Sequence, residues 1–134
     1  MLRVLTVILL ALALANFTLL AANEPGDVES AAVEIKGDVA AAAEGWSLIE
    51  QGALLIDVRS AAEFERGHIE GALNVPHTDI DAITAVIGED RSRSVVLYCG
   101  SGRRAGISQE MLEELGYEDV FNASGFSALQ ATQP

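Results

Sequence analysis

The sequence predicts an α/β fold, a doubly wound parallel sheet of about five strands with helices on both faces. Short apolar runs alternate with segments of helical periodicity over most of the chain. The apolar runs are hydrophobic throughout and do not alternate with polar residues, which is typical of strands that are covered on both sides in a parallel sheet. Glycines and polar residues separate these runs from the helical segments and mark the boundaries of each element.

The first 22 residues predict a secretory signal peptide over residues 1–22. Arg3 supplies a positively charged start, an apolar run follows it, and small residues such as Ala21 and Ala22 offer a cleavage site. We therefore expect an exported, periplasmic protein.

A retained membrane anchor is the alternative, because residues 4–22 approach the length that spans a bilayer. Asn16 and Thr18 interrupt this stretch, which favours export with cleavage. Residues 23–37 are polar and acidic and are expected to form a linker or N-terminal arm. Residues 38–134 then form one folded domain.

The folded domain is expected to open with a helix over residues 39–51. Asp38 is a candidate N-cap, Gly52 ends the segment, and Trp46 is expected to pack in the core. The apolar run at 53–58 predicts the first buried strand.

A short helix and a short strand follow. Ser60 and Glu63 have the spacing of a capping box, and Gly67 ends the helix that they begin. Residues 72–76 predict the second strand.

The second half of the domain repeats this alternation. Isoleucines at helical spacing predict a helix over 77–87, and the β-branched run at 94–99 is the strongest strand. Residues 104–117 form an amphipathic helix that ends at a glycine. Its apolar side is expected to hold Ile107, Met111, Leu112 and Leu115. A last strand over 119–124 and a helical turn over 125–130 complete the domain.

The acidic composition restricts the partners. The formal net charge is −12, so the general field of the protein repels nucleic acid and anionic lipid. We expect no nucleic-acid partner and, after signal cleavage, no membrane contact. The sequence has no Cys-x-x-Cys pair and no cluster of cysteine and histidine, so no metal or other cofactor is predicted.

Cys99 is the only cysteine, and it stands at the carboxyl end of the strongest strand. Ligand sites in parallel α/β sheets form beyond the carboxyl ends of strands. A lone thiol in an exported protein is either buried and inert, bonded to another chain, or reactive.

The segment that follows Cys99 predicts an anion cradle around its sulfur. Two glycines permit a tight turn, a serine adds a hydroxyl, and two arginines add positive charge at the start of a helix: Gly100, Gly102, Ser101, Arg103 and Arg104. Each feature favours a thiolate over a thiol and favours a bound anion. The pattern therefore indicates a nucleophilic cysteine.

Two stretches of the sequence resemble the rhodanese family of sulfurtransferases. LLIDVRSAAEFERGHIEGALNVP carries Asp-Val-Arg, Glu-Phe, Gly-His-Ile-x-Gly-Ala and Asn-Val-Pro, and VVLYCGSGRRA carries the cysteine loop. The similarity runs from about Gly52 to Gly125. Together with the signal peptide, it is greatest to the exported single-domain members, so residues 38–134 are expected to form a rhodanese-like domain.

The resemblance implies a thiosulfate sulfurtransferase. In the family, the cysteine attacks the outer sulfur of thiosulfate, releases sulfite and becomes a persulfide, from which cyanide or a thiol removes the sulfur. Carried over to this chain, Cys99 is the nucleophile and residues 100–104 bind the substrate. Arg104 is the first candidate for holding the oxyanion, and Arg103, which can point to solvent, is the second.

The resemblance also places Asp57, Arg59 and His68 at family positions, where a structural role is expected for all three. The expected partners are thiosulfate and a thiol or cyanide acceptor, and the expected state is a monomer. The family often carries tryptophans near its C-terminal end, where this chain has Phe126 and ends early.

Three alternatives remain for the cysteine loop. Phosphatases and arsenate reductases on a similar fold use Cys-x5-Arg, whereas Cys99 to Arg104 is Cys-x4-Arg, a smaller ring that suits a single sulfur atom. A persulfide carrier without turnover would use the same loop. Covalent dimerisation through Cys99 is disfavoured by its recessed position.

Overall fold

The structure is a computed structural model that describes residues 32–134. The expected signal peptide and most of the expected linker lie outside the described residues. The chain divides into two units, and the fold discussed below is the unit Glu34–Pro134. Its elements in chain order are α2 (Val39–Glu50), β1 (Leu54–Asp57), α3 (Ala61–Glu65), β2 (Leu73–Asn74), α4 (Ile80–Ile87), β3 (Val95–Cys99), α5 (Arg103–Glu114), β4 (Val120–Gly125) and α6 (Phe126–Ala131).

The strands form one parallel sheet in the order β2-β1-β3-β4. The predicted α/β fold class, with a doubly wound parallel sheet, is confirmed. The described residues contain four strands, whereas about five were expected. Residues 32–38, the described part of the chain before α2, contain no strand, and the amide of Lys36 there donates to the Ser127 hydroxyl at 2.8 Å.

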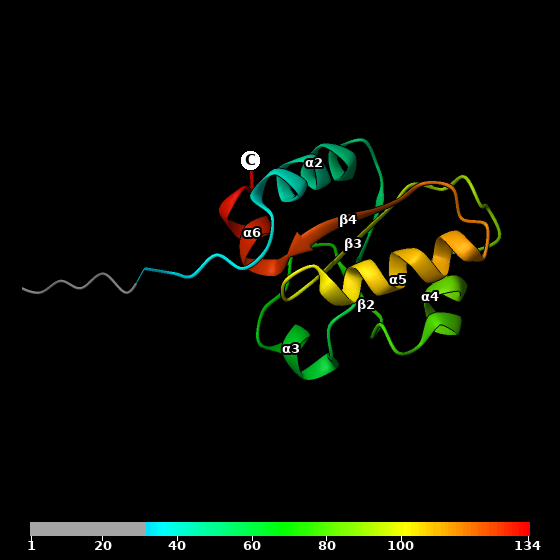
Figure 1. Cartoon of the computed structure of the whole chain (residues 1–134), viewed down its shortest axis with the longest axis horizontal. Helices are drawn as coiled ribbons and strands as arrows, with labels where there is room; N and C mark the ends of the chain where they lie inside the picture. The colour runs from blue at the N-terminus through cyan, green and yellow to red at the C-terminus, as the bar shows by residue number, and fades with distance from the viewer. Residues whose placement is uncertain (1–31) are drawn as a thin grey trace, which may run out of the picture. The chain divides into compact units, whose positions relative to one another are not determined.

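The side chains of each strand point alternately to the two faces of the sheet, and each face holds one buried cluster that helices cover. In Figure 1, α2 and α6 lie on one side of the strands, and α4 and α5 lie on the other. Tyr98 belongs to the cluster under α2 and α6, and Cys99 belongs to the cluster under α4 and α5. The nucleophile candidate therefore lies on the same face of the sheet as the helix that follows it.

Local capping fixes where two of the helices begin. The Asp38 carboxylate accepts the amides of Ala40 and Ala41 at the start of α2. Ser60 and Glu63 form the expected capping box at the start of α3. Both helix starts agree with the sequence pattern, because capping depends on residues within one turn.

The expected apolar side of α5 is wrong for three of its four residues. Leu112 is buried, but the other three are at least one-third exposed: Ile107, Met111 and Leu115. The face of α5 that packs on the sheet carries Ala105, Ser108 and Leu112. Small residues let this helix approach the strands closely, and the larger apolar residues then point away from them.

The C-terminal segment forms α6 and packs on the sheet despite its departure from the family pattern. Phe126 and Leu129 belong to the cluster under α2 and α6, and the indole Nε1 of Trp46 donates to the carbonyl of Leu129 at 2.8 Å. Within residues 32–134, no helix has the length and apolar character needed to cross a bilayer.

Candidate active site

The candidate site lies where the winding of the sheet reverses. β1 and β3 are neighbours in the sheet, and they end at Asp57 and Cys99. The chain leaves β1 toward the edge strand β2 and leaves β3 toward the opposite edge strand β4. A crevice at the carboxyl ends of such a strand pair is the usual ligand site of open α/β sheets.

Cys99 lies just inside the loop that joins β3 to α5. Its Sγ accepts the amide N–H of Gly102 at 3.0 Å, and only 1% of the residue is exposed. Gly102 has a φ of +97°, and a Cβ there would lie 3.1 Å from the Cα of Ser124. The turn therefore requires glycine both for its backbone angle and for its close approach to the end of β4.

The N-terminus of α5 faces this loop. Gly102 is the N-cap, and no side chain caps the helix at this end. The first N–H groups of an α-helix have no partner within the helix, and together they carry a partial positive charge. The helix start thus adds positive potential beside Cys99 without a charged side chain.

Arg104 crosses the loop and binds a carboxylate of α3. Its Nη1 and Nη2 donate to the two carboxylate oxygens of Glu63 at 2.8 and 2.9 Å. A Cβ on Gly100 would lie 3.2 Å from Nη2 of Arg104, so the guanidinium rests against the loop backbone. The Glu63 hydrogen bonds, and to a lesser degree the Cys99 sulfur, raise the pKa of Arg104 above its ordinary value.

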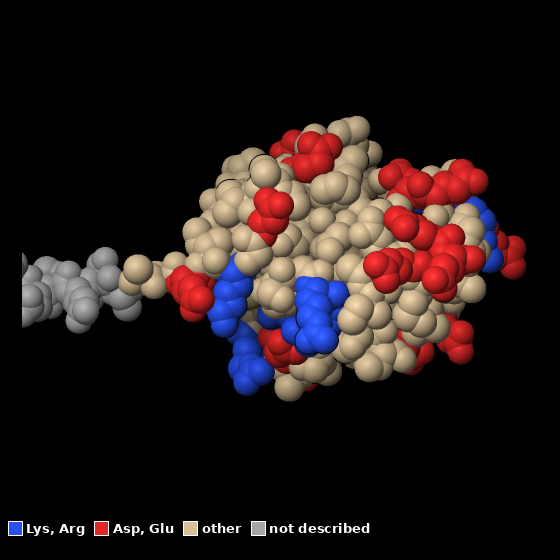
Figure 2. All heavy atoms as spheres, in the orientation of Figure 1, with Lys and Arg blue, Asp and Glu red and all other residues tan. Residues whose placement is uncertain are grey.

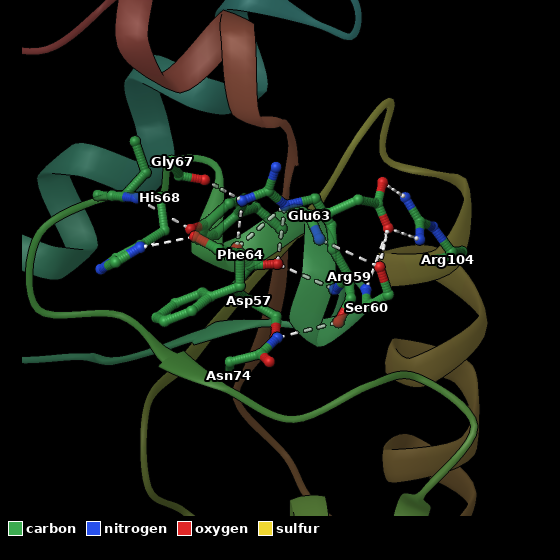
Figure 3. Close-up of polar contacts among 11 residues, drawn as sticks. Asp57, Arg59, Ser60, Glu63, Phe64, Gly67, His68, Asn74 and Arg104 are labelled. Atoms are coloured by element: carbon green, nitrogen blue, oxygen red, sulfur yellow. Dashed lines mark hydrogen bonds and ion pairs between the residues drawn. The ribbon is translucent and has the colours of Figure 1, made fainter.

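Glu63 was expected only as a helix-capping residue, and its second role was missed. Its carboxylate accepts the amide and the hydroxyl of Ser60 at 3.1 and 2.8 Å, in addition to Arg104. The hydrogen bonds from Arg104, and then those from Ser60, hold the pKa of Glu63 well below its usual range. Figure 3 shows Glu63 between Ser60 and Arg104. The only sequence signal was the Glu-Phe of the family motif.

Asp57 and Arg59 form a buried ion pair behind the site. Nη2 of Arg59 lies 2.7 Å from Oδ2 of Asp57 and also donates to the carbonyl of Gly67 at 2.7 Å (Figure 3). Burial alone would lower the pKa of Arg59, but the hydrogen bond and charge of Asp57 raise it above its ordinary value. The guanidinium also stacks over Phe126, with 4.5 Å between its central carbon and the ring centroid. These contacts tie the loops after β1 and α3 to the C-terminal segment.

His68 lies three residues after the end of α3, and it contacts Phe64 of that helix. Its Nδ1 lies 2.9 Å from the carbonyl oxygen of Phe64, and its ring stacks on the Phe64 ring with centroids 3.7 Å apart. Neither contact leads to Cys99.

Ser101 and Arg103 are exposed on the loop. Within the described residues, Arg103 takes part in no ion pair. Of the two arginines expected in the cradle, Arg104 is paired with Glu63 and Arg103 is exposed to solvent.

The end of β4 supports the loop from behind, which the sequence did not indicate. Nδ2 of Asn122 donates to the carbonyl of Gly102 at 2.9 Å. Ser124 has a φ of +73°, a conformation that costs a residue with a side chain on the order of 1 kcal/mol or more. Its backbone amide donates to Oδ1 of Asn122 at 2.9 Å, and its hydroxyl accepts the amide of Asp38 at 2.6 Å.

No group of three or more histidine, cysteine, aspartate or glutamate residues within 32–134 could hold a metal ion. A pocket of about 430 Å³ lies beside the C-terminal ends of α4 and α5, where Leu115 and Tyr117 contribute to its lining. It lies a full helix length from Cys99, about 18 Å at 1.5 Å per residue.

Comparison with known proteins places the chain in a family. The model of the rhodanese-like domain matches residues 41–131. The chain belongs to the rhodanese-like family. This confirms the resemblance found in the sequence.

Individual relatives agree with the family assignment. The chain is 36% identical to the thiosulfate sulfurtransferase PspE of Escherichia coli over 84 residues, which is 63% of this chain and 72% of PspE. A structure described as rhodanese with anions from E. coli has a TM-score of 0.54 and 34% identity, and covers 57% of this chain and 91% of its own. The rhodanese-like domain also occurs in proteins of other activity: a tRNA uridine(34) hydroxylase of Erwinia tasmaniensis is 27% identical over 77 residues, 54% of this chain and 22% of its own length.

Proposed function

We propose that the protein is an exported thiosulfate sulfurtransferase that carries a sulfane sulfur as a persulfide on Cys99. The observation that carries the proposal is the placement of the Cys99 sulfur under the amide of Gly102 at the start of α5, in a loop whose Gly100 lies against the Arg104 guanidinium. The named sulfurtransferases among its relatives support the same activity. The signal-like residues 1–22 support export to the periplasm.

In the proposed first half-reaction, the Cys99 thiolate attacks the outer sulfur of thiosulfate. A bond forms between Sγ and that sulfur, the sulfur–sulfur bond of thiosulfate breaks, and its electron pair leaves with sulfite. In the second half-reaction, cyanide or a thiolate takes the outer sulfur and restores the Cys99 thiolate. In both steps a sulfane sulfur passes from one nucleophile to another and the leaving group keeps the bonding electron pair, so the transfer itself requires no external oxidant.

The positive groups around the loop have a defined role in this proposal. Arg104 binds the sulfonate oxygens, and the amide of Gly102 stabilises negative charge on sulfur before and after transfer. Residues 100–104 form the wall of the substrate site, whereas Asp57, Arg59 and His68 keep the surrounding loops in place.

The loop length disfavours a phosphatase. The Cys-x4-Arg ring from Cys99 to Arg104 is one residue shorter than the Cys-x5-Arg ring of the phosphatase and arsenate reductase type. The tight approach of Gly102 to Ser124 leaves the loop no room to widen on that side. We therefore expect no hydrolysis of aryl phosphates.

Mass spectrometry of the intact protein tests the persulfide directly. After incubation with thiosulfate, the mass should rise by one sulfur atom, about 32 Da, and the sulfur should be found on Cys99. Cys99→Ser should fold, acquire no extra sulfur and form no thiocyanate from thiosulfate and cyanide. Sulfur loading without steady-state thiocyanate would instead identify a persulfide carrier, and an unchanged mass would contradict the proposal.

A further inference from the structure

The guanidinium assigned to the substrate is already paired in this structure. Arg104 holds Glu63 through two parallel hydrogen bonds of 2.8 and 2.9 Å, an arrangement that is stronger and more directional than a single contact. Both side chains are about 30% exposed, so solvent and substrate can still reach the pair.

Glu63 is held in place from its other side as well. Its Oε2 accepts both the amide and the hydroxyl of Ser60, which form the capping box of α3. These two contacts do not involve Arg104, so they hold the Glu63 carboxylate at the start of α3. An anion that binds Arg104 therefore meets the charge of Glu63 close by.

Arg104 retains the hydrogen-bond donors needed for such binding. A guanidinium has five N–H groups in one plane, and Glu63 occupies two of them. The face toward Gly100 and Cys99 is where the guanidinium touches the loop. A sulfonate at this position would contact Arg104 and would have the Glu63 carboxylate behind that same guanidinium.

The charges around this position largely cancel. Arg104 is balanced by Glu63, and Arg59 is balanced by Asp57. Figure 2 shows several Lys and Arg side chains near one another on the visible face, with Asp and Glu atoms beside them as well as over the rest of that face. The exposed Arg103 and the N-terminus of α5 remain as the uncompensated positive groups of the loop.

We propose that Glu63 moderates the charge selectivity of the site, by reducing the advantage that the positive groups of the loop give to a sulfur donor with two negative charges over a donor with one. This inference rests on the proposed sulfur transfer and names a donor class that Glu63 helps the site to accept beside the dianion thiosulfate: singly charged thiosulfonates and small persulfides. Coulomb energy is proportional to the charge of the ligand. The carboxylate therefore opposes a dianion twice as strongly as a monoanion at the same place.

Glu63→Gln isolates this charge. Glutamine at the third helical position also closes a capping box, so α3 keeps its start. Glu65→Gln is the matched control, because it removes the same charge from an exposed position of the same helix. Glu63→Met is a second neutral variant, and Glu63→Asp retains the charge.

Anion binding is measured by protection of Cys99 from iodoacetamide, with sulfate as the dianion and methanesulfonate as the monoanion. A unit charge about 8 Å away in a water-like dielectric changes a monoanion's dissociation constant about 2.4-fold and a dianion's about six-fold. Glu63→Gln and Glu63→Met should therefore tighten methanesulfonate about 2.4-fold and sulfate about six-fold. Glu65→Gln and Glu63→Asp should keep the native ratio, and added salt should shrink the difference.

In Glu63→Gln, kcat/KM should rise for thiosulfate by the factor expected for sulfate, and for methanethiosulfonate by the smaller factor expected for methanesulfonate. The inference is overturned if Glu63→Gln weakens both anions, if it changes both equally, if Glu65→Gln has the same effect, or if neither anion protects Cys99. If protection follows the expected ratio but neither donor yields a persulfide, the charge selectivity stands and the proposed function fails.

Discussion

Arg59→Met is expected to destabilise the domain while leaving the sulfur chemistry of each folded molecule unchanged. The change removes three side-chain hydrogen bonds from Arg59 to the Asp57 carboxylate, of 3.0, 3.0 and 2.7 Å, and one of 2.7 Å to the carbonyl of Gly67. Asp57 has no exposed surface, so its charge would remain in the interior with the backbone amide of residue 59 as its main donor.

The magnitude follows from that unpaired carboxylate. Removing one partner of a buried ion pair costs about 3–5 kcal/mol, because the remaining charge has lost both water and counter-ion. A domain of this size has a total stability of roughly 5–15 kcal/mol. The variant should therefore lose about one-fifth or more of its stability.

Urea unfolding followed by the fluorescence of Trp46, the only tryptophan, measures this loss. The double variant Asp57→Asn with Arg59→Met is the control. It removes both charges and should be more stable than Arg59→Met alone, by about 2 kcal/mol, because no uncompensated charge is left. The reasoning is refuted if Arg59→Met costs less than about 1 kcal/mol or if the double variant is no more stable. Activity per folded molecule that falls tenfold or more would contradict a structural role for Arg59.

Three other changes test the supports of the loop. Gly125→Ala should cost about 2 kcal/mol in urea unfolding, because its Cβ would collide with the carbonyl oxygen of Lys36 and would lie 2.7 Å from the carbonyl oxygen of Gly100. Asn122→Ala should cost about 1 kcal/mol through the lost hydrogen bond to Gly102, and should slow thiocyanate formation. The pKa of Glu63 is lower in the folded state than in the unfolded state, where it is near 4.3. The ionised carboxylate therefore stabilises the fold fully above about pH 4.3, and this stabilisation is lost as the pH falls toward the folded-state pKa. Acid titration should therefore narrow the stability difference between the native protein and Glu63→Gln.

Local chemistry made the helix starts and the cysteine loop predictable. A cap such as Asp38 or Ser60 acts within one turn, and the loop after Cys99 is continuous in sequence. The buried face of α5 was not predictable from hydrophobicity, because Ala105 and Ser108 pack on the sheet through their small size.

Contacts between residues far apart in the chain could not be predicted from the sequence pattern either. Glu63 and Arg104 are 41 residues apart, and they meet because β1 and β3 are neighbours in the sheet. The positive φ of Ser124 likewise depends on the contact between the end of β4 and Gly102. A serine at this position does not by itself predict such a backbone conformation.

Glu63 has two roles that a substitution can separate: it caps α3, and it binds Arg104. A capping box accepts glutamate or glutamine with similar ease, so its hydrogen bonds do not require a negative charge, although the helix dipole favours one in the first turn of α3. The bidentate contact with Arg104 does require a carboxylate at residue 63, because only a carboxylate offers that guanidinium two equivalent oxygens. If the charge at residue 63 governs which anions reach Cys99, glutamine there should leave the fold of α3 intact and alter the donors that the site accepts.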